Sequence, residues 1–228
     1  MVEIQGNEAT TFKFVVSYAS LCELAEDAKR FGEVPDEATT TAQVSERYKI
    51  MREAGVFERF RPTGEKDFEE WVDSHARAIK ARKVSVPLFQ EMWAAVASES
   101  VATTIMGCVA EDYEKLVNEI ACKLFPHSSF VQEVERELWS PSRQASVYDA
   151  TNSLKRLAAR YLRLCVRRKR QVAIVDVKVV DALLAMLPSL VEDELRLQGH
   201  ANDLKLILAH ASGIEAEFAR RGMVLLPA

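Results

Sequence analysis

The residues whose types and spacing could do chemistry in this sequence are five arginines: Arg156, Arg160, Arg163, Arg167 and Arg170. Their steps of four, three, four and three residues place all five on one narrow stripe if the segment is a helix. Lys155, Arg168 and Lys169 add three more cations, with no acid among the eight. Guanidinium groups bind phosphate and carboxylate oxygens, so this arginine stripe is a candidate site for RNA or another polyanion. The alternative is a solvated face whose charges pair with acids elsewhere.

Residues with catalytic or metal-binding chemistry form no comparable pattern. The four histidines are scattered along the chain: His75, His127, His200 and His210. The sequence contains no H-E-x-x-H, no glycine-rich phosphate loop and no G-x-S-x-G. We therefore expect no enzymatic activity, no metal and no cofactor. An enzyme whose site forms only by tertiary proximity is the poorest of the alternatives.

The cysteines also predict no site. Cys22, Cys108, Cys122 and Cys165 stand at least fourteen residues apart and form no C-x-x-C pair. This spacing favours neither a zinc site nor a disulfide framework, so we expect small buried thiols in a reducing compartment. The first residues lack a basic segment followed by an apolar one, and no apolar run approaches the ~20 residues of a membrane span. We expect a cytosolic protein.

Composition limits the function further. The chain has 228 residues, of which 48% are apolar and 28% charged, as in a globular protein that buries a core. Its net charge of -4 argues against a dedicated nucleic-acid-binding protein, because contacts with phosphates normally make the whole domain basic. Any contact with a polyanion must therefore be local.

Apolar residues recur at steps of three and four, and glycine and proline are few, which predicts an all-α protein. The first helix has apolar positions from Phe14 to Ala28 and is closed by Gly32. A short helix follows over Ala42–Ala54. The next three begin after Gly64, at Pro87 and near Val101, and a sixth covers Asp112–Phe125.

Pro126 marks a break between two helical lobes. Beyond it we predict a helix from Phe130 to the residues before Pro141, and a long helix capped by Ser142 or Ser146 that runs to about Arg168. Valines alternate with polar residues over 175–179, which fits a strand, but the same valines continue a helical stripe. Since no partner strand is predicted, we expect a helix begun by Asp176 and ended by Pro188. A final helix covers Asn202 to about Arg220.

Several of these segments occur in an order that resembles the Gag capsid region of LTR (Gypsy-type) retrotransposons and their domesticated, Arc-like descendants. An aromatic and a glycine, Phe60 and Gly64, precede a helix that carries the pair Phe68 and Trp71. The segments similar to later capsid helices are Tyr113–Phe125, Leu183–Pro188 and Asp203–Phe218. The resemblance covers about 160 residues and implies a two-lobed, retroviral-capsid-like helical fold.

The sequence departs from the family in one turn. Many relatives have a glutamine-glycine pair before Ser-Val, whereas this chain has Arg143-Gln144-Ala145-Ser146-Val147. No zinc knuckle is present. We predict an N-terminal helical region and linker over 1–59, a capsid N-terminal-like lobe over 60–125, a C-terminal-like lobe over 126–222 and a tail over 223–228.

The resemblance implies a structural protein that assembles with itself into virus-like particles enclosing RNA. Phe68 and Trp71 are expected to anchor the core of the N-terminal lobe. The segment from Trp139 to Val147 and the final helix are the expected contacts between subunits. The alternative is a helical adaptor, derived from a capsid domain, that binds a peptide or regulatory protein in a groove.

Overall fold

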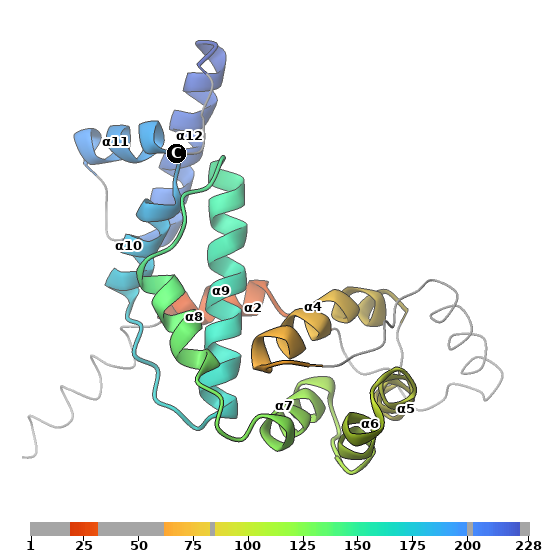
Figure 1. Ribbon diagram of the computed structural model, residues 1–228. Helices are drawn as coiled ribbons and strands as arrows, with labels where there is room; N and C mark the ends of the chain where they lie inside the picture. The colour runs from red at the N-terminus through yellow and green to blue at the C-terminus, as the bar shows by residue number, and fades with distance from the viewer. Residues whose placement is uncertain (1–18, 32–61, 83–84, 200–202, 224–228) are drawn as a thin grey trace, which may run out of the picture. The chain divides into compact units, whose positions relative to one another are not determined.

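The computed structural model describes residues 19–31, 62–82, 85–199 and 203–223 and is all-α, which confirms the predicted fold class (Figure 1). The described helices are α2 (Ala19–Asp27), α4 (Glu65–Arg82), α5 (Val86–Val96), α6 (Glu99–Met106), α7 (Tyr113–Leu124), α8 (Phe130–Trp139), α9 (Val147–Arg167), α10 (Asp176–Met186), α11 (Ser189–Gln198) and α12 (Leu204–Arg220). Within these ranges no helix is both long and apolar enough to cross a membrane. The helix predicted over Ala42–Ala54 lies outside the described residues.

Contacts divide the chain into two compact units. The middle unit comprises the described residues of Lys29–Phe130, and the C-terminal unit joins those of Met1–Ala28 to those of Val131–Ala228. This grouping differs from the predicted separate region over 1–59. The difference arises because α2 buries Leu21 and Leu24 in the C-terminal unit, where it packs against α9 and α10.

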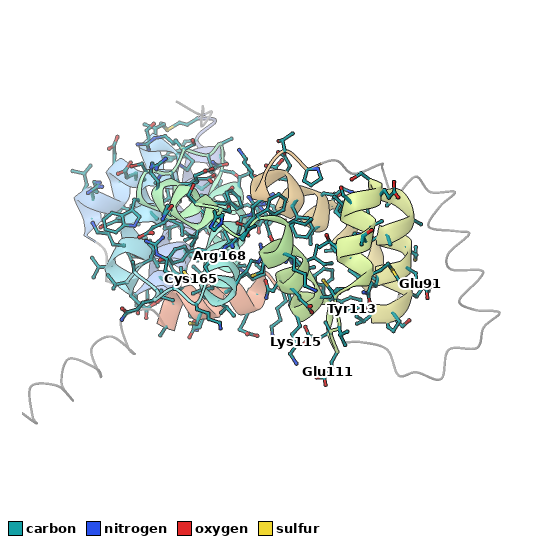
Figure 2. The ribbon with its side chains drawn as sticks, turned by 60° about the horizontal axis from the view of Figure 1, so that its bottom comes forward. Glu91, Glu111, Tyr113, Lys115, Cys165 and Arg168 are labelled. Carbon is teal, nitrogen blue, oxygen red and sulfur yellow. The ribbon has the colours of Figure 1, made fainter. Side chains whose placement is uncertain are left out.

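The middle unit is built from α4 to α7, and polar residues fix where these helices begin. The Asp67 carboxylate at the start of α4 accepts the Thr63 backbone N–H at 3.1 Å. Pro87 lies in the first turn of α5, where a missing N–H costs nothing. The Asp112 side chain caps α7 by accepting the Lys115 N–H, and the Lys115 ammonium lies 3.3 Å from Glu111 (both labelled in Figure 2).

Aromatic side chains fill the core of the middle unit. Phe68 and Trp93 are fully buried, and Trp71 retains 9% of its surface. Trp71 stacks on Trp93 with ring centroids 4.6 Å apart, and Phe89 lies 4.1 Å from Trp93. Phe31, four residues beyond the end of α2, stacks on Tyr113 at 5.0 Å and belongs to the same core. Burial of such rings is among the largest single-residue contributions available to a small domain.

The C-terminal unit is arranged around α9, which contacts α2, α10 and α12. The ambiguous segment over 175–179 enters α10, which confirms the predicted helix. Pro188 does more than end α10: its carbonyl accepts the N–H groups of Val191 and Glu192 and so opens α11. The sequence reasoning assigned Pro188 only as a terminator and therefore missed α11, which pairs with α12.

Helix α2 is fastened to the C-terminal unit by polar contacts as well as by its two leucines. The Ser20 backbone N–H donates to the Asp176 carboxylate at 3.1 Å, which satisfies one of the free N–H groups at the start of α2. Lys155 on α9 lies 2.8 Å from Asp27 and lowers the pKa of that carboxyl. These contacts join segments that are far apart in the sequence, 156 residues in the case of Ser20 and Asp176.

Replacing Trp71 by alanine should destabilise the protein by about 3–5 kcal/mol, because it removes a nearly buried ring stacked on another. Urea unfolding followed by circular dichroism measures the loss. Trp139→Ala is the control, since Trp139 is 50% exposed and should cost far less. Equal stability of Trp71→Ala and the unmodified chain would contradict a core role for Trp71.

Candidate anion-binding face of helix α9

Helix α9 is held in place at its start by capping and by its apolar side. The Ser146 hydroxyl accepts the Asp149 N–H at 3.0 Å, and the Val147 N–H donates to Glu215 of α12 at 2.9 Å. The apolar side chains that α9 buries include Leu154, Leu157, Ala158, Tyr161, Leu164 and Cys165. Because these residues face the core, Arg156, Arg160 and Arg163 are left to the flanks and the outer face.

The five arginines of the stripe do not form one exposed surface. Arg156 is exposed, Arg160 and Arg163 are half-buried, and Arg167 is buried with 6% of its surface accessible. Arg170 lies beyond the end of the helix. The prediction of a five-residue helical stripe is therefore wrong for Arg170, which is not in the helix. Because Arg167 is buried, it belongs neither to a solvated face nor to an open polyanion site.

The helix ends in a Schellman turn, which explains the position of Arg170. The Arg170 N–H donates to the Cys165 carbonyl at 2.9 Å and the Lys169 N–H to the Val166 carbonyl at 3.1 Å. Lys169 adopts a φ of 49°, a conformation that glycine normally supplies at this position. Figure 2 labels Cys165 and Arg168 near this end of α9.

A buried tyrosine holds the chain that follows this turn. The Tyr161 hydroxyl accepts the Ala173 N–H at 2.9 Å, and burial raises the pKa of Tyr161 to about 12, although the bond from Ala173 acts in the opposite direction. Arg170 lies 2.8 Å from Glu135 of α8. Arg170 thus ties the end of α9 to α8 within the C-terminal unit.

Arg170 and Lys155 are accordingly engaged with carboxylates of their own unit, Arg170 with Glu135 and Lys155 with Asp27. Arg156 has a different environment. Its guanidinium donates to the Asn152 carbonyl at 3.3 Å and to the Ser153 hydroxyl at 3.5 Å, distances at the long limit of hydrogen bonding. Most of its five N–H donors therefore remain available to a ligand.

A cleft of about 230 Å³ opens beside Arg156. The residues lining it come from α8, the following loop, α9 and the end of α10: Glu137, Pro141, Ser142, Gln144, Ser153, Arg156, Leu157, Arg160 and Met186. Most of these residues are polar or charged, and Pro141, Leu157 and Met186 are the apolar ones. This cleft brings two of the predicted arginines, Arg156 and Arg160, into one concave site.

The loop that forms one wall of the cleft is fixed to α10 and α11. The Gln144 N–H donates to the Met186 carbonyl at 2.7 Å. The Arg143 guanidinium donates to the Leu187 carbonyl at 2.9 Å and lies 2.8 Å from the Glu192 carboxylate. Although burial acts to raise it, the pKa of Glu192 is lowered by Arg196 and Arg143. The turn that contains Arg143 and Gln144 therefore has a defined set of contacts.

The other predicted anchor residues have different environments. Phe68 and Trp71 lie in the core of the middle unit, as described above. Val147 is also buried, with 2% of its surface accessible, so its side chain is unavailable to another subunit without rearrangement. Trp139 is half-exposed, and the Lys178 ammonium lies 5.0 Å from its ring centroid. Of the two named contact residues, Trp139 is therefore the accessible one and Val147 is not.

An arginine-centred cluster in the middle unit was not predicted from the sequence. The Arg30 side chain, 5% exposed, makes two hydrogen bonds to Glu114 at 2.7 and 2.9 Å and lies 2.8 Å from Glu69 and 3.2 Å from Asp73. Burial acts to lower the pKa of Arg30, but these carboxylates outweigh it and raise the pKa. Arg30 and Glu114 are 84 residues apart, and no local pattern links them.

The described residues form no group of three or more histidines, cysteines or acids placed to hold a metal ion. His75 is buried, with Nδ1 2.6 Å from the Trp71 carbonyl, which is a structural contact. His127 and His210 are exposed, and His200 lies outside the described residues. Burial raises the pKa of the Cys108 and Cys165 thiols, which disfavours their reactive thiolates.

No protein-family model matches this chain, and no curated protein or solved structure has significant similarity to it. The resemblance to Gag capsid proteins therefore stays a prediction.

Replacing Lys169 by glycine should stabilise the protein by up to about 1 kcal/mol, because glycine adopts the left-handed conformation without the steric cost of a Cβ atom. Denaturant unfolding measures the change. Lys169→Ala is the matched control: it removes the same charge but keeps the Cβ atom. A gain in Lys169→Ala equal to that in Lys169→Gly would show that charge, and not strain, is responsible.

Proposed function

We propose that this chain is a structural protein that associates with itself through its C-terminal unit, in the manner expected of a capsid protein. The observation that supports this is the set of large apolar side chains exposed on that unit. Among the described residues these are Trp139, Tyr148, Val166, Val177, Leu190, Leu197, Leu206 and Met223. Exposed apolar side chains mark interaction sites in folded proteins where they gather into a patch.

Three of these leucines lie on α11 and α12, two helices that contact each other, and we propose that they form one surface, here called the α11–α12 patch: Leu190, Leu197 and Leu206. Leu190 and Leu197 are seven residues apart and share a face of α11. Gln198, next to Leu197, hydrogen-bonds to His210 at 2.7 Å, and His210 shares a face of α12 with Leu206 four residues before it. Leu197 is 82% and Leu206 60% exposed, so the patch faces solvent.

A second apolar surface lies where α8 ends beside the start of α10. Lys178 reaches the Trp139 ring, and its neighbour Val177 is 62% exposed. Two separate surfaces allow one subunit to contact more than one neighbour. Weak contacts then combine, because each additional contact is made at a high effective concentration. This is the physical basis we propose for a shell.

RNA inside such a shell is the second part of the proposal, and the structure narrows which cations could contact it. Arg167 is buried, and Lys155 and Arg170 already meet carboxylates. Arg156 and Lys169 are the exposed members of the basic segment. A contact through these two cations is small and suits sequence-independent packaging. The alternative function, a helical adaptor, is favoured by the cleft beside α9.

Self-association should depend on the α11–α12 patch. Analytical ultracentrifugation of the full chain over a range of protein and salt concentrations should show oligomers, and electron microscopy should show particles. Leu197→Glu with Leu206→Glu should weaken association at least tenfold, which corresponds to about 1.4 kcal/mol. Val109→Glu is the control, since Val109 is 91% exposed in the middle unit. A monomer under all conditions would contradict self-association and favour the adaptor.

RNA binding should respond to the two exposed cations. Arg156→Gln with Lys169→Gln should weaken binding of a single-stranded oligonucleotide and reduce the slope of log K against log salt by about 1.4, or about 0.7 per phosphate contact. Arg220→Gln with Arg221→Gln is the control, because it removes the same charge from the end of α12. An unchanged slope would exclude the α9 segment as the RNA contact.

A further inference from the structure

Helix α2 packs in the C-terminal unit, although the chain enters the middle unit directly after this helix. We propose that two copies of the protein exchange α2, so that each copy places this helix in the groove on α9 and α10 of the other. The proposal rests on the proposed function, association of the chain with itself, and adds a contact between copies that does not use the α11–α12 patch. The occupant of the groove is thus α2 of a second copy.

Contacts at both ends of α2 make the groove specific for one helix in one orientation. The two leucines of α2 lie three residues apart on one face and are buried where α2 packs against α9 and α10. At the start of α2, the Ser20 N–H donates to Asp176 of α10 at 3.1 Å. At its end, the Asp27 carboxylate lies 2.8 Å from the Lys155 ammonium of α9. A second copy of α2 would satisfy all of these groups in the same way.

Helix α2 is a weakly held part of the C-terminal unit. It has nine residues, and isolated helices shorter than about 12–15 residues are marginal in water, so its helical structure depends on packing in the groove. Two of its polar attachments are solvent-accessible ion pairs, Asp27 with Lys155 and Glu23 with Lys205 at 3.0 Å. Pairs of this kind contribute little to stability. Local opening should therefore release α2 more readily than the longer helices of the unit.

Only Ala28 and Lys29 separate the end of α2 from residues that are anchored in the middle unit. Arg30 is buried and bonded to carboxylates of that unit, and Phe31 stacks on Tyr113 in its core. These two anchored residues keep a released α2 tethered to a folded unit. The helix is then available to the groove of a second copy without unfolding of the middle unit.

An exchanged pair contains the same α2 contacts as two separate copies, which makes exchange a low-cost route to association. The main cost is the loss of independent motion of the two copies. A helix on a short tether meets its own groove at an effective concentration on the order of 1 mM, so a second copy competes only at a similar local concentration. Exchange should therefore be negligible between dilute copies and should rise steeply between copies held close together.

Disulfide trapping between two different variants detects exchange even when it is rare. One variant carries Ser20→Cys and the other Asp176→Cys, because these positions are in contact when α2 occupies the groove. A mixture at about 1 mM should form a disulfide-linked dimer on a non-reducing gel. Both variants also carry substitutions that remove the half-buried native thiols and the α11–α12 patch: Cys22→Ser, Cys122→Ser, Leu197→Glu and Leu206→Glu.

A control pair measures trapping by random collision. It combines Ser20→Cys with Val109→Cys, an exposed position in the middle unit. The groove pair should be trapped at least about fivefold faster than this pair, because α2 dwells in the groove. A second trap at the other end of the helix, Asp27→Cys in one variant with Lys155→Cys in the other, should give the same result independently.

Two further changes test the groove itself. Leu21→Asp with Leu24→Asp in the Asp176→Cys variant disables its own α2 and should raise trapping at least about tenfold, since the competing helix is removed. Leu24→Asp in the Ser20→Cys variant should instead lower trapping to the control level, because the exchanged helix then brings a charge into an apolar groove. Circular dichroism of each variant shows whether the remaining helices are retained.

The exchange would be overturned by trapping no faster than the control at both ends of α2, or by trapping that Leu24→Asp leaves unchanged. Sedimentation of the unmodified chain separates this test from the proposed function. Oligomers of the unmodified chain without any trapped pair would remove the exchange and leave self-association through the patch. Trapped pairs from a chain that sediments as a monomer in dilute solution would support the exchange and remove the patch as a contact.

Discussion

The C-terminal unit depends on the burial of one side of α9. Leu154, Tyr161 and Leu164 are fully buried there, and α2, α10 and α12 all pack on this helix. Once that side is committed to the core, the opposite flank must carry the charged residues, since there is no room for them inside without partners. The cleft, the capped start and the Schellman turn are then consequences of where α9 begins and ends.

Several arginines in this protein have a structural role, in which the guanidinium joins separate segments through hydrogen bonds and ion pairs. Arg30 gathers three carboxylates, Arg143 holds a loop to α10 and α11, and Arg170 joins the end of α9 to α8. The planar guanidinium suits this role because it makes several hydrogen bonds in a fixed geometry. A cluster of basic residues in a sequence is thus weak grounds for a polyanion site until the acids that face it are known.

Features that depend on neighbours in the sequence were predictable, and features that depend on distant partners were not. The helix over Asp176–Met186 followed from the lack of a partner strand, which decided an ambiguous valine pattern, and the start of α9 is at one of the two predicted caps, Ser146 and not Ser142. The burial of Arg167 and the Arg30 cluster could not be predicted, because their environment comes from segments remote in the chain. Arg156 and Arg160 were singled out for their charge, but the cleft they share requires the position of the loop at Gln144.

The position of α2 has a consequence for synthesis of the chain. The Ser20 N–H and the Asp176 carboxylate are 156 residues apart, and translation proceeds at about 5–20 residues per second, so roughly 8–30 s separate the appearance of the two partners. All residues of the middle unit emerge during this interval and are free to fold. Leu21 and Leu24 meanwhile lack their native cover. Helix α2 is therefore the first described helix to leave the ribosome and one of the last to complete its packing. Until α10 emerges, the nascent C-terminal unit depends on protection of these two leucines from contact with other apolar surfaces.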